Sequence, residues 1–351
     1  MKKLRKLQRG DKVAIVSPSF AAPGVWPEVY ELALTRLRDV FGLVPIEFSA
    51  TKKVGASGKE RAADLVAAFE DTEIKAVFAS LGGDDQVTYI KNLPAEPFVN
   101  NPKPFFGFSD NSHFSNFLFL NGVPSFYGAS LLTQFTVYPE MDKFTVSYLE
   151  KALFDDGEVE LMESKEFCDS NLSEDGKSIV NWDKPETLSI RKMYETNSGW
   201  RWAGHQNAEG LLWGGCIECI DEMLRHGSSI PSLEQFADIV LMLESSEEMP
   251  TAENVRRVIR AFGERGILKQ VHGVLVGRPK AWHFDHMNSI EKKQKFRVDQ
   301  REVILKTVRE YNTSIPVIQN IDFGHTDPQI SMPYGSKVRI DSETKKILVT
   351  F

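Results

Sequence analysis

Short apolar runs alternate with segments of helical periodicity in the first part of the chain. Apolar runs of strand length occupy residues 12–16, 44–48 and 74–80. Between them, residues 27–41 and 57–69 place apolar side chains at helical spacing. Strands and helices in this rhythm predict an α/β fold with a doubly wound parallel sheet. Because such sheets bind ligands beyond the carboxyl ends of their strands, the residues that follow each strand are the candidates for function.

The pattern changes after residue 150. Residues 151–207 are polar, rich in turn-forming residues and poorly periodic, which predicts a connecting segment. Strand-like and helical segments alternate again in residues 208–351, and this part ends in short apolar runs typical of antiparallel strands. We therefore expect an N-terminal α/β domain over residues 1–150 and a second, smaller mixed α/β domain over residues 208–351.

Two details of the second half are less regular. Residues 282–295 are polar and mixed, whereas Val303, Ile304 and Val308 indicate a helix further on. Thr251 is expected to cap an earlier helix that ends at Gly263.

Composition places the chain among ordinary globular proteins. Of its 351 residues, 42% are hydrophobic and 26% are charged, and the net charge of -7 argues against a partner such as nucleic acid. The apolar run near the start, residues 13–16, is far too short for a signal peptide or a membrane span. We expect a cytoplasmic protein without a membrane partner.

The three cysteines form no disulfide framework, which favours a reducing compartment. Cys216 and Cys219 make a lone Cys-x-x-Cys, and only Cys168 remains as a further thiolate. Since a structural zinc site needs four ligands, two small buried thiols are the favoured interpretation. Neither a metal nor another cofactor is expected.

Ser109 lies at a predicted corner between a strand and a helix. Phe105, Phe106 and Phe108 end an apolar run, and residues 115–120 continue at helical spacing. A Gly-x-Ser at such a corner holds a hydroxyl exposed above a sheet, with the next backbone N–H facing the same space. The alternative is that Ser109 and Asp110 only cap the helix, since Asn111 stands where the hydrolase elbow has its second glycine.

Gly82 and Gly83 follow the strand over residues 74–80 and are expected at the same edge of the sheet. Two glycines let the backbone approach a ligand and present N–H groups to an anion, or they form a tight turn without a ligand. Neither the dinucleotide nor the nucleoside triphosphate glycine pattern occurs in the chain.

Glu244 and His325 follow two further apolar strands. A carboxylate at the end of a buried strand is costly unless another group pairs with it. The order Ser109, Glu244, His325 is compatible with a Ser–His–Glu triad, in which the carboxylate orients the imidazole and the imidazole activates the serine. Taken alone, His325 has the alternative role of a hydrogen-bonded structural histidine.

The sequence resembles the LD-carboxypeptidase family of serine peptidases. The segments that carry the resemblance are residues 10–19, 56–65, 82–83, 107–110, 243–244 and 324–325, in the order of the family. The resemblance implies that Ser109 is the nucleophile, His325 the general base and Glu244 its orienting carboxylate. It also implies an oxyanion hole made by the backbone N–H groups of Gly83 and Asp110, and a homodimer with the active site between the two domains.

One segment departs from the commonest family pattern. Residues 81–85 are Leu-Gly-Gly-Asp-Asp, where typical members have Arg-Gly-Gly-Tyr-Gly, and the connecting segment is extended and contains tryptophan. In both respects the chain is similar to the microcin C immunity peptidase branch. That branch cleaves an amide between an aminoacyl group and a nucleotide-like group, with a tryptophan stacked on the base. Trp182 is the nearest match, although a tryptophan in this segment can equally pack the connection onto the domains.

These observations lead to one expected function and two alternatives. We expect a serine peptidase or amidase that acts on a small peptide-like substrate, with a peptidyl or aminoacyl nucleotide favoured. The first alternative is a muropeptide LD-carboxypeptidase of cell-wall recycling. The second is a non-catalytic binding protein on the same fold, which is disfavoured because none of the three catalytic residue types is missing.

Overall fold

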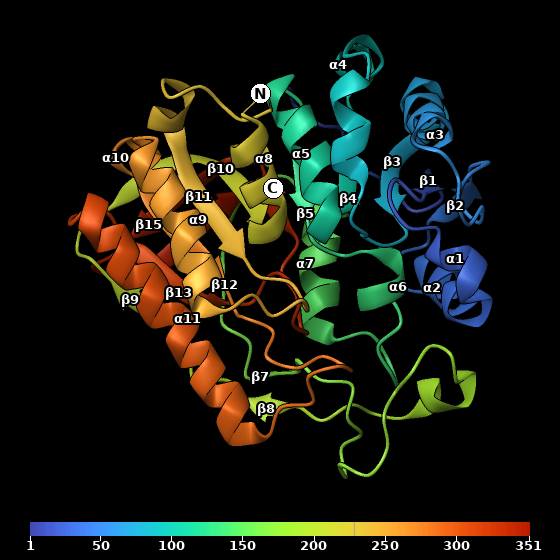
Figure 1. Cartoon of the computed structure of the whole chain (residues 1–351). Helices are drawn as coiled ribbons and strands as arrows, with labels where there is room; N and C mark the ends of the chain where they lie inside the picture. The colour runs from blue at the N-terminus through green and yellow to red at the C-terminus, as the bar shows by residue number, and fades with distance from the viewer. Residues whose placement is uncertain (228) are drawn as a thin grey trace.

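The computed structural model describes residues 1–227 and 229–351. The N-terminal part of the chain, coloured blue to teal, forms one side of the molecule, and the C-terminal part, yellow to red, forms the other (Figure 1). Each side is built on its own sheet, with helices packed against it.

The first sheet has six strands and contains the expected parallel arrangement. In spatial order they are β14 (Met332–Tyr334), β5 (Ser125–Tyr127), β4 (Phe105–Gly107), β3 (Ile74–Ala79), β1 (Lys12–Val16) and β2 (Val44–Glu47). Strands β1 to β5 are parallel, and only β14 runs antiparallel to its neighbour. From β1 the chain passes to β2 on one side of β1 and then to β3 on the other side. The order in which the chain forms neighbouring strands therefore reverses between β1 and β3, although the strands themselves stay parallel. This is the topological switch point at which α/β sheets bind ligands.

Both faces of the first sheet are buried. Val13 and Ile15 of β1 belong to one apolar cluster, whereas Ala14 and Val16 belong to another on the opposite face. This alternation is the period of two expected of a strand that is covered on both sides. The helices of this part are α1 (Ala22–Val25), α2 (Pro27–Asp39), α3 (Gly58–Glu70), α4 (Glu96–Asn100), α5 (Ser112–Leu120), α6 (Leu131–Gln134) and α7 (Lys143–Phe154).

The second sheet is mixed, as expected. In spatial order it contains β6 (Glu158–Glu160), β16 (Lys346–Thr350), β15 (Lys337–Asp341), β10 (Ala208–Cys216), β11 (Ile239–Glu244), β12 (Gly273–Gly277), β13 (Val317–Ile321) and β9 (Arg201–Ala203). The middle strands β10 to β13 are parallel, and the strands that flank them are antiparallel. Its helices are α8 (Ile217–His226), α9 (Ala252–Glu264), α10 (Ile267–Gln270) and α11 (Ile290–Tyr311).

Short elements complete the description. The 3-10 helices are η1 (Gln86–Thr88), η2 (Ile90–Asn92), η3 (Ser109–Asn111), η4 (Pro185–Ser189) and η5 (Gln235–Asp238). Strands β7 (Glu166–Phe167) and β8 (Glu195–Thr196) pair with each other inside the segment that connects the two sides.

The chain crosses between the two sheets more often than the sequence suggested. Strand β14, from the C-terminal part, joins the first sheet, while β6 and β9 of the connecting segment join the second. Since these strands pair across residues 150 and 208, domain boundaries at those two residues stay a proposal.

Helix α11 begins earlier than its apolar positions indicated. Residues 290–295 belong to the helix although all of them except Ile290 are polar. Their environment explains this, because Lys293 and Arg297 point into the connecting segment and pair with its buried Asp169. Arg297 Nη1 also lies 3.0 Å from Glu195 Oε2. This charged contact fixes the connecting segment on α11, and an analysis of apolar periodicity does not detect it.

None of the helices in the described ranges combines the length and the apolar character needed to traverse a bilayer.

Candidate active site

Ser109 occupies a strained corner at the carboxyl end of the first sheet. Strand β4 ends at Gly107, and Ser109 has φ 63°, a left-handed conformation that is uncommon for a residue with a side chain. A Cβ atom on Gly82 would lie 2.9 Å from Ser109 Cβ, so only glycine allows the loop after β3 to approach this corner. Strain of this kind persists when the surrounding structure enforces it, and it is concentrated at functional sites.

Ser112 connects the corner to the second side of the molecule by hydrogen bonds. Ser112 Oγ donates to the carbonyl of Ser109 over 2.7 Å, and the N–H of Cys216 donates to Ser112 Oγ over 3.2 Å. Cys216 is the last residue of β10, so the strand end of the second sheet is coupled directly to the Ser109 backbone.

Glu244 and His325 form a buried pair. Glu244 is the last residue of β11, and its Oε2 accepts a hydrogen bond from His325 Nδ1 over 2.7 Å. The Glu244 side chain is 0% exposed and that of His325 is 8% exposed. Gly324, with φ 95°, makes this approach possible, because a Cβ there would lie 2.6 Å from Glu244 Oε2. The carboxylate therefore fixes the orientation of the imidazole and leaves Nε2 as its outward nitrogen.

Tyr127 links this pair to Ser109. Its hydroxyl donates to Glu244 Oε1 over 2.5 Å and accepts from the backbone N–H of Ser109 over 3.3 Å. Sequence analysis missed this residue, because a tyrosine at the end of a short apolar strand is typical of a core position. The fully buried hydroxyl connects the first sheet to the carboxylate of the second.

The outward nitrogen of His325 faces a second carboxylate. Nε2 lies 3.1 Å from Oε2 of Glu247, whose side chain is 45% exposed. Burial by itself would lower the pKa of His325, but the carboxylates of Glu244 and Glu247 outweigh it and raise the pKa to about 9. Within residues 1–227 and 229–351, no hydrogen bond joins Ser109 Oγ to His325.

A cavity of about 760 Å³ opens in front of Ser109, and Gly83 and Asp110 line it beside the serine. The Asp110 carboxylate is held by its Oδ2, which accepts hydrogen bonds from Ser19 Oγ and from the backbone N–H groups of Asp85 and Gln86. Burial raises the pKa of the Asp110 carboxyl to about 6, although these hydrogen bonds oppose the rise. The arrangement fixes the backbone of Asp110 next to the serine.

The cavity wall is strongly acidic in the part of the chain that the structure describes. Its charged residues are Asp84, Asp110, Glu218, Asp221, Glu222, Glu247, Glu248, Arg225 and Arg257. The two arginines are paired, Arg225 with Asp221 at 2.8 Å and Arg257 with Glu253 at 3.1 Å. A cavity lined by one sign of charge attracts groups of the opposite sign.

Trp182 does not line this cavity but packs on Trp26. Its ring lies edge to face on Trp26 with a centroid distance of 5.0 Å, and Trp26 in turn lies 5.9 Å from Phe20. The row of rings begins near the serine corner, because the N–H of Phe20 donates to the carbonyl of Gly82 over 3.1 Å.

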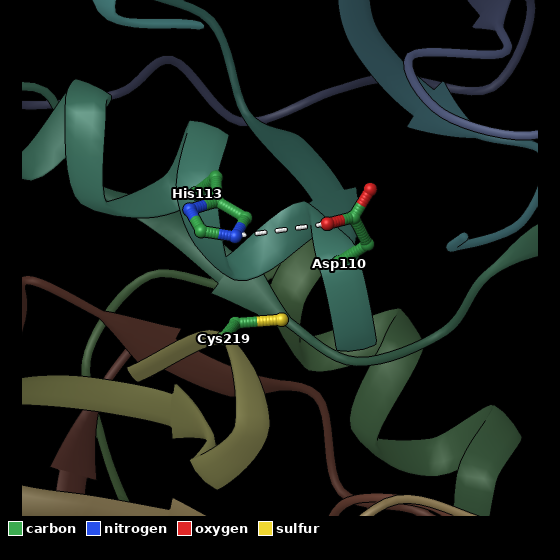
Figure 2. Close-up of side chains that lie close together, drawn as sticks. All are labelled: Asp110, His113 and Cys219. Carbon is green, nitrogen blue, oxygen red and sulfur yellow. Dashed lines mark ion pairs between the residues drawn. The ribbon is translucent and has the colours of Figure 1, made fainter. Parts of the chain in front are cut away.

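The two thiols of the Cys-x-x-Cys are buried, as expected. The structure adds a feature that their spacing could not show. Of the two cysteines, Cys219 lies close to Asp110 and His113 (Figure 2). The side chains of Asp110, His113 and Cys219 form a group able to hold a metal ion.

Two family models match the chain. The LD-carboxypeptidase N-terminal domain matches residues 13–128, and the LD-carboxypeptidase C-terminal domain matches residues 209–340. The chain therefore belongs to the LD-carboxypeptidase family, which supports a hydrolase of the carboxypeptidase type.

The relatives include both putative carboxypeptidases and an immunity protein. A putative carboxypeptidase of Treponema pallidum is 26% identical over 357 residues, which cover 99% of this chain and 95% of the relative. The microcin C7 self-immunity protein MccF of Escherichia coli is 24% identical over 294 residues, which cover 83% of this chain and 78% of MccF.

Solved structures of the immunity branch share the whole fold. The MccF-like protein of Streptococcus pneumoniae, in complex with AMP, aligns with a TM-score of 0.81 at 25% identity and covers 97% of this chain and 98% of its own. MccF in complex with glutamyl sulfamoyl guanosine has the same fold, with a TM-score of 0.82 at 19% identity and coverage of 99% and 98%. The expected family and its microcin C immunity branch are both confirmed.

Replacing Tyr127 by phenylalanine tests the link between the sheets. Tyr127→Phe leaves the buried Glu244 Oε1 without its donor, and an unsatisfied buried acceptor costs about 1–3 kcal/mol. We expect a loss of that size in the free energy of unfolding, measured by urea titration. Tyr334→Phe, at another fully buried tyrosine on the adjacent strand β14, is the control. Equal stability of Tyr127→Phe and wild type would contradict the link.

Proposed function

We propose that the chain is a serine peptidase or amidase in which Ser109 is the nucleophile, His325 the general base and Glu244 the residue that orients the base. The observation that carries the proposal is the buried pairing of Glu244 with His325 over 2.7 Å, behind the strained serine corner. A carboxylate that fixes one imidazole nitrogen and leaves the other outward is the arrangement that activates a serine.

The reaction runs in two halves. Ser109 Oγ attacks the substrate carbonyl carbon while His325 Nε2 takes its proton, and the same proton then passes to the leaving amine as the C–N bond breaks. Water next attacks the acyl-serine ester, with His325 again accepting and returning the proton. Before the first step, Nε2 exchanges its contact with Glu247 for one with Ser109.

The negative charge that develops on the carbonyl oxygen needs donors in place. We assign this role to the backbone N–H groups of Gly83 and Asp110, which line the cavity on either side of Ser109. Both are backbone groups on segments fixed by close packing, because a Cβ on Gly83 would lie 2.1 Å from Ser19 Oγ. Donors of this kind need little reorganisation when the oxyanion forms.

The favoured substrate is a peptidyl or aminoacyl nucleotide. The acidic cavity suits the free amino group of an aminoacyl or peptidyl moiety, and the row Phe20, Trp26, Trp182 offers aromatic faces near the serine corner for a base. The complexes of related proteins with AMP and with glutamyl sulfamoyl guanosine support this class of ligand. Cleavage of a muropeptide in cell-wall recycling is the alternative, and the putative carboxypeptidases among the relatives support it.

The cellular setting and the assembly remain proposals of the same kind. We place the enzyme in the cytoplasm, on the basis of its cysteine content, and assign it a homodimeric state by analogy with its family.

Replacing the nucleophile is the direct test of the mechanism. Ser109→Ala should reduce kcat by a factor on the order of 10⁶, since a nucleophile that acts with its base contributes about that much. Hydrolysis of an aminoacyl sulfamoyl adenosine and of a tetrapeptide muropeptide is measured for both proteins. Ser115→Ala, which removes a buried hydroxyl without a partner in the described structure, should keep full activity. A Ser109→Ala protein with a tenth of wild-type activity would exclude the serine mechanism.

The second carboxylate near His325 predicts an unusual pH dependence. The base must be neutral, and its pKa is raised to about 9, so kcat/KM of the wild type should rise with pH until about 9. Glu247→Gln removes one of the charges that raise this pKa, so its profile should shift to lower pH and the variant should be faster at pH 7. Glu248→Gln, one residue further along the exposed loop, should leave the profile in place. A profile for Glu247→Gln that superimposes on the wild type would refute the role of this contact.

Trp182 distinguishes the two substrate classes. Stacking on a nucleobase contributes roughly 1–3 kcal/mol, so Trp182→Ala should lower kcat/KM for an aminoacyl nucleotide by about tenfold to a hundredfold. A muropeptide has no base to stack, and its turnover should barely change. Trp182→Phe keeps an aromatic face and should lose much less. Equal losses on both substrates would mean that Trp182 only packs the connecting segment onto Trp26.

A further inference from the structure

Three buried side chains of different donor chemistry converge beside the serine corner. Asp110 lies in η3, His113 in the first turn of α5, and Cys219 in α8 on the other side of the molecule (Figure 2). One ligand atom from each lies within 4.8 Å of the other two. His113 Nε2 is 3.7 Å from Asp110 Oδ1.

The Asp110 carboxylate has a free oxygen that faces this group. All three of its hydrogen bonds, from Ser19, Asp85 and Gln86, go to Oδ2. In the described residues, Oδ1 accepts no hydrogen bond, although the Asp110 side chain is only 1% exposed. This oxygen has no protein donor and belongs to a side chain that lines the cavity, so a cation is one partner that would pair with its charge.

A further carboxylate, that of Glu222, lies beside His113 and also lines the cavity. Glu222 Oε2 lies 3.2 Å from His113 Nε2, and the Glu222 side chain is 35% exposed. Asp110, Cys219 and Glu222 all line the cavity in front of Ser109. An ion can therefore reach the group from solvent along the substrate cavity.

The donor set determines which ion would fit. Zinc ligands lie at about 2.0–2.3 Å from the metal, so two ligands of one tetrahedral ion are roughly 3.3–3.8 Å apart. The 3.7 Å from His113 Nε2 to Asp110 Oδ1 is close to that spacing. A thiolate with an imidazole and a carboxylate favours zinc over magnesium or calcium, which prefer oxygen alone.

We propose that Asp110, His113 and Cys219 form a three-residue binding site, next to Glu222, for a divalent cation of the zinc class that inhibits hydrolysis at Ser109. When the Cys219 sulfur bonds to the metal, its proton leaves to solvent. The sulfur then no longer donates to the carbonyl of Ser109, which it contacts at 3.5 Å in the metal-free protein. The ion also occupies the wall beside the N–H of Asp110. The inhibitory half of this proposal depends on the proposed function, whereas the binding half does not.

Cobalt(II) is the probe for the binding half. Adding Co²⁺ to the wild-type protein should give a thiolate-to-cobalt charge-transfer band that saturates at one ion per chain. Cys219→Ser should abolish the band, and His113→Asn should weaken binding by at least about tenfold. Cys168→Ser and His226→Asn are the matched controls, because the first removes another buried thiol and the second an exposed histidine of α8, and both should bind like the wild type. Thermal unfolding verifies that each variant is folded.

Zinc inhibition tests the second half. Zn²⁺ at the concentration that saturates the site should reduce hydrolysis by wild type, Cys168→Ser and His226→Asn at least tenfold, and a chelator should restore it. Each variant is compared with its own metal-free rate, and Cys219→Ser should resist inhibition. A chelator alone should not lower wild-type activity, because the proposed ion takes no part in the hydrolysis itself.

The outcomes separate the site from the function. Failure of the wild type to bind Co²⁺ at one ion per chain, or an unchanged band in Cys219→Ser, overturns the site. Stoichiometric binding with unchanged hydrolysis overturns the inhibitory role. If the wild type hydrolyses neither substrate, the proposed function and the inhibition that depends on it both fail, while the cobalt spectrum still decides the metal site.

Discussion

A single buried carboxylate constrains how the two halves of this protein meet. Glu244 ends a central strand of the second sheet with a side chain that has no access to solvent. A charge in that position is tolerated only when hydrogen bonds satisfy both of its oxygens. One oxygen accepts from Tyr127 of the first sheet and the other from His325 of the second. The same contacts that satisfy the carboxylate therefore join the sheets and orient the imidazole.

The serine corner depends on this junction and on close backbone packing. Ser109 adopts a left-handed conformation. Its N–H donates to the Tyr127 hydroxyl, and its carbonyl accepts from Ser112 Oγ. Gly82 permits the approach of the loop after β3. The corner is thus fixed from both sheets before any substrate binds, which is the kind of preorganisation that acyl transfer requires. Glu247 opposes the activation of Ser109, because it stabilises the protonated imidazole of His325 and holds His325 Nε2 away from the serine.

Much of the fold followed from local pattern. The parallel arrangement of β1 to β4 was predictable because their apolar runs alternate with segments of helical periodicity. Ser109, Glu244 and His325 could be nominated because each lies at or just after the end of a predicted strand, where α/β sheets carry their functional residues. Ser109 belongs to the first sheet and the other two to the second. Their distances could not be predicted, and the role of each in hydrolysis is still a proposal.

What the sequence could not show depends on contacts between distant segments. Tyr127 looks like any aromatic core residue until Glu244 is placed against its hydroxyl. The first turns of α11 lack an apolar stripe because Lys293 and Arg297 face charges in the connecting segment. The group of Asp110, His113 and Cys219 joins residues more than a hundred positions apart, so the spacing of the Cys-x-x-Cys gave no hint of it.

Covalent labelling tests the central claim most directly. A fluorophosphonate reacts with a serine that a neighbouring base activates, and peptide mass spectrometry locates the adduct. The account predicts one adduct per chain, on Ser109, formed by the wild type and lost when His325 is replaced by alanine. An adduct on another residue, or equally fast labelling of Ser109 without His325, would contradict it.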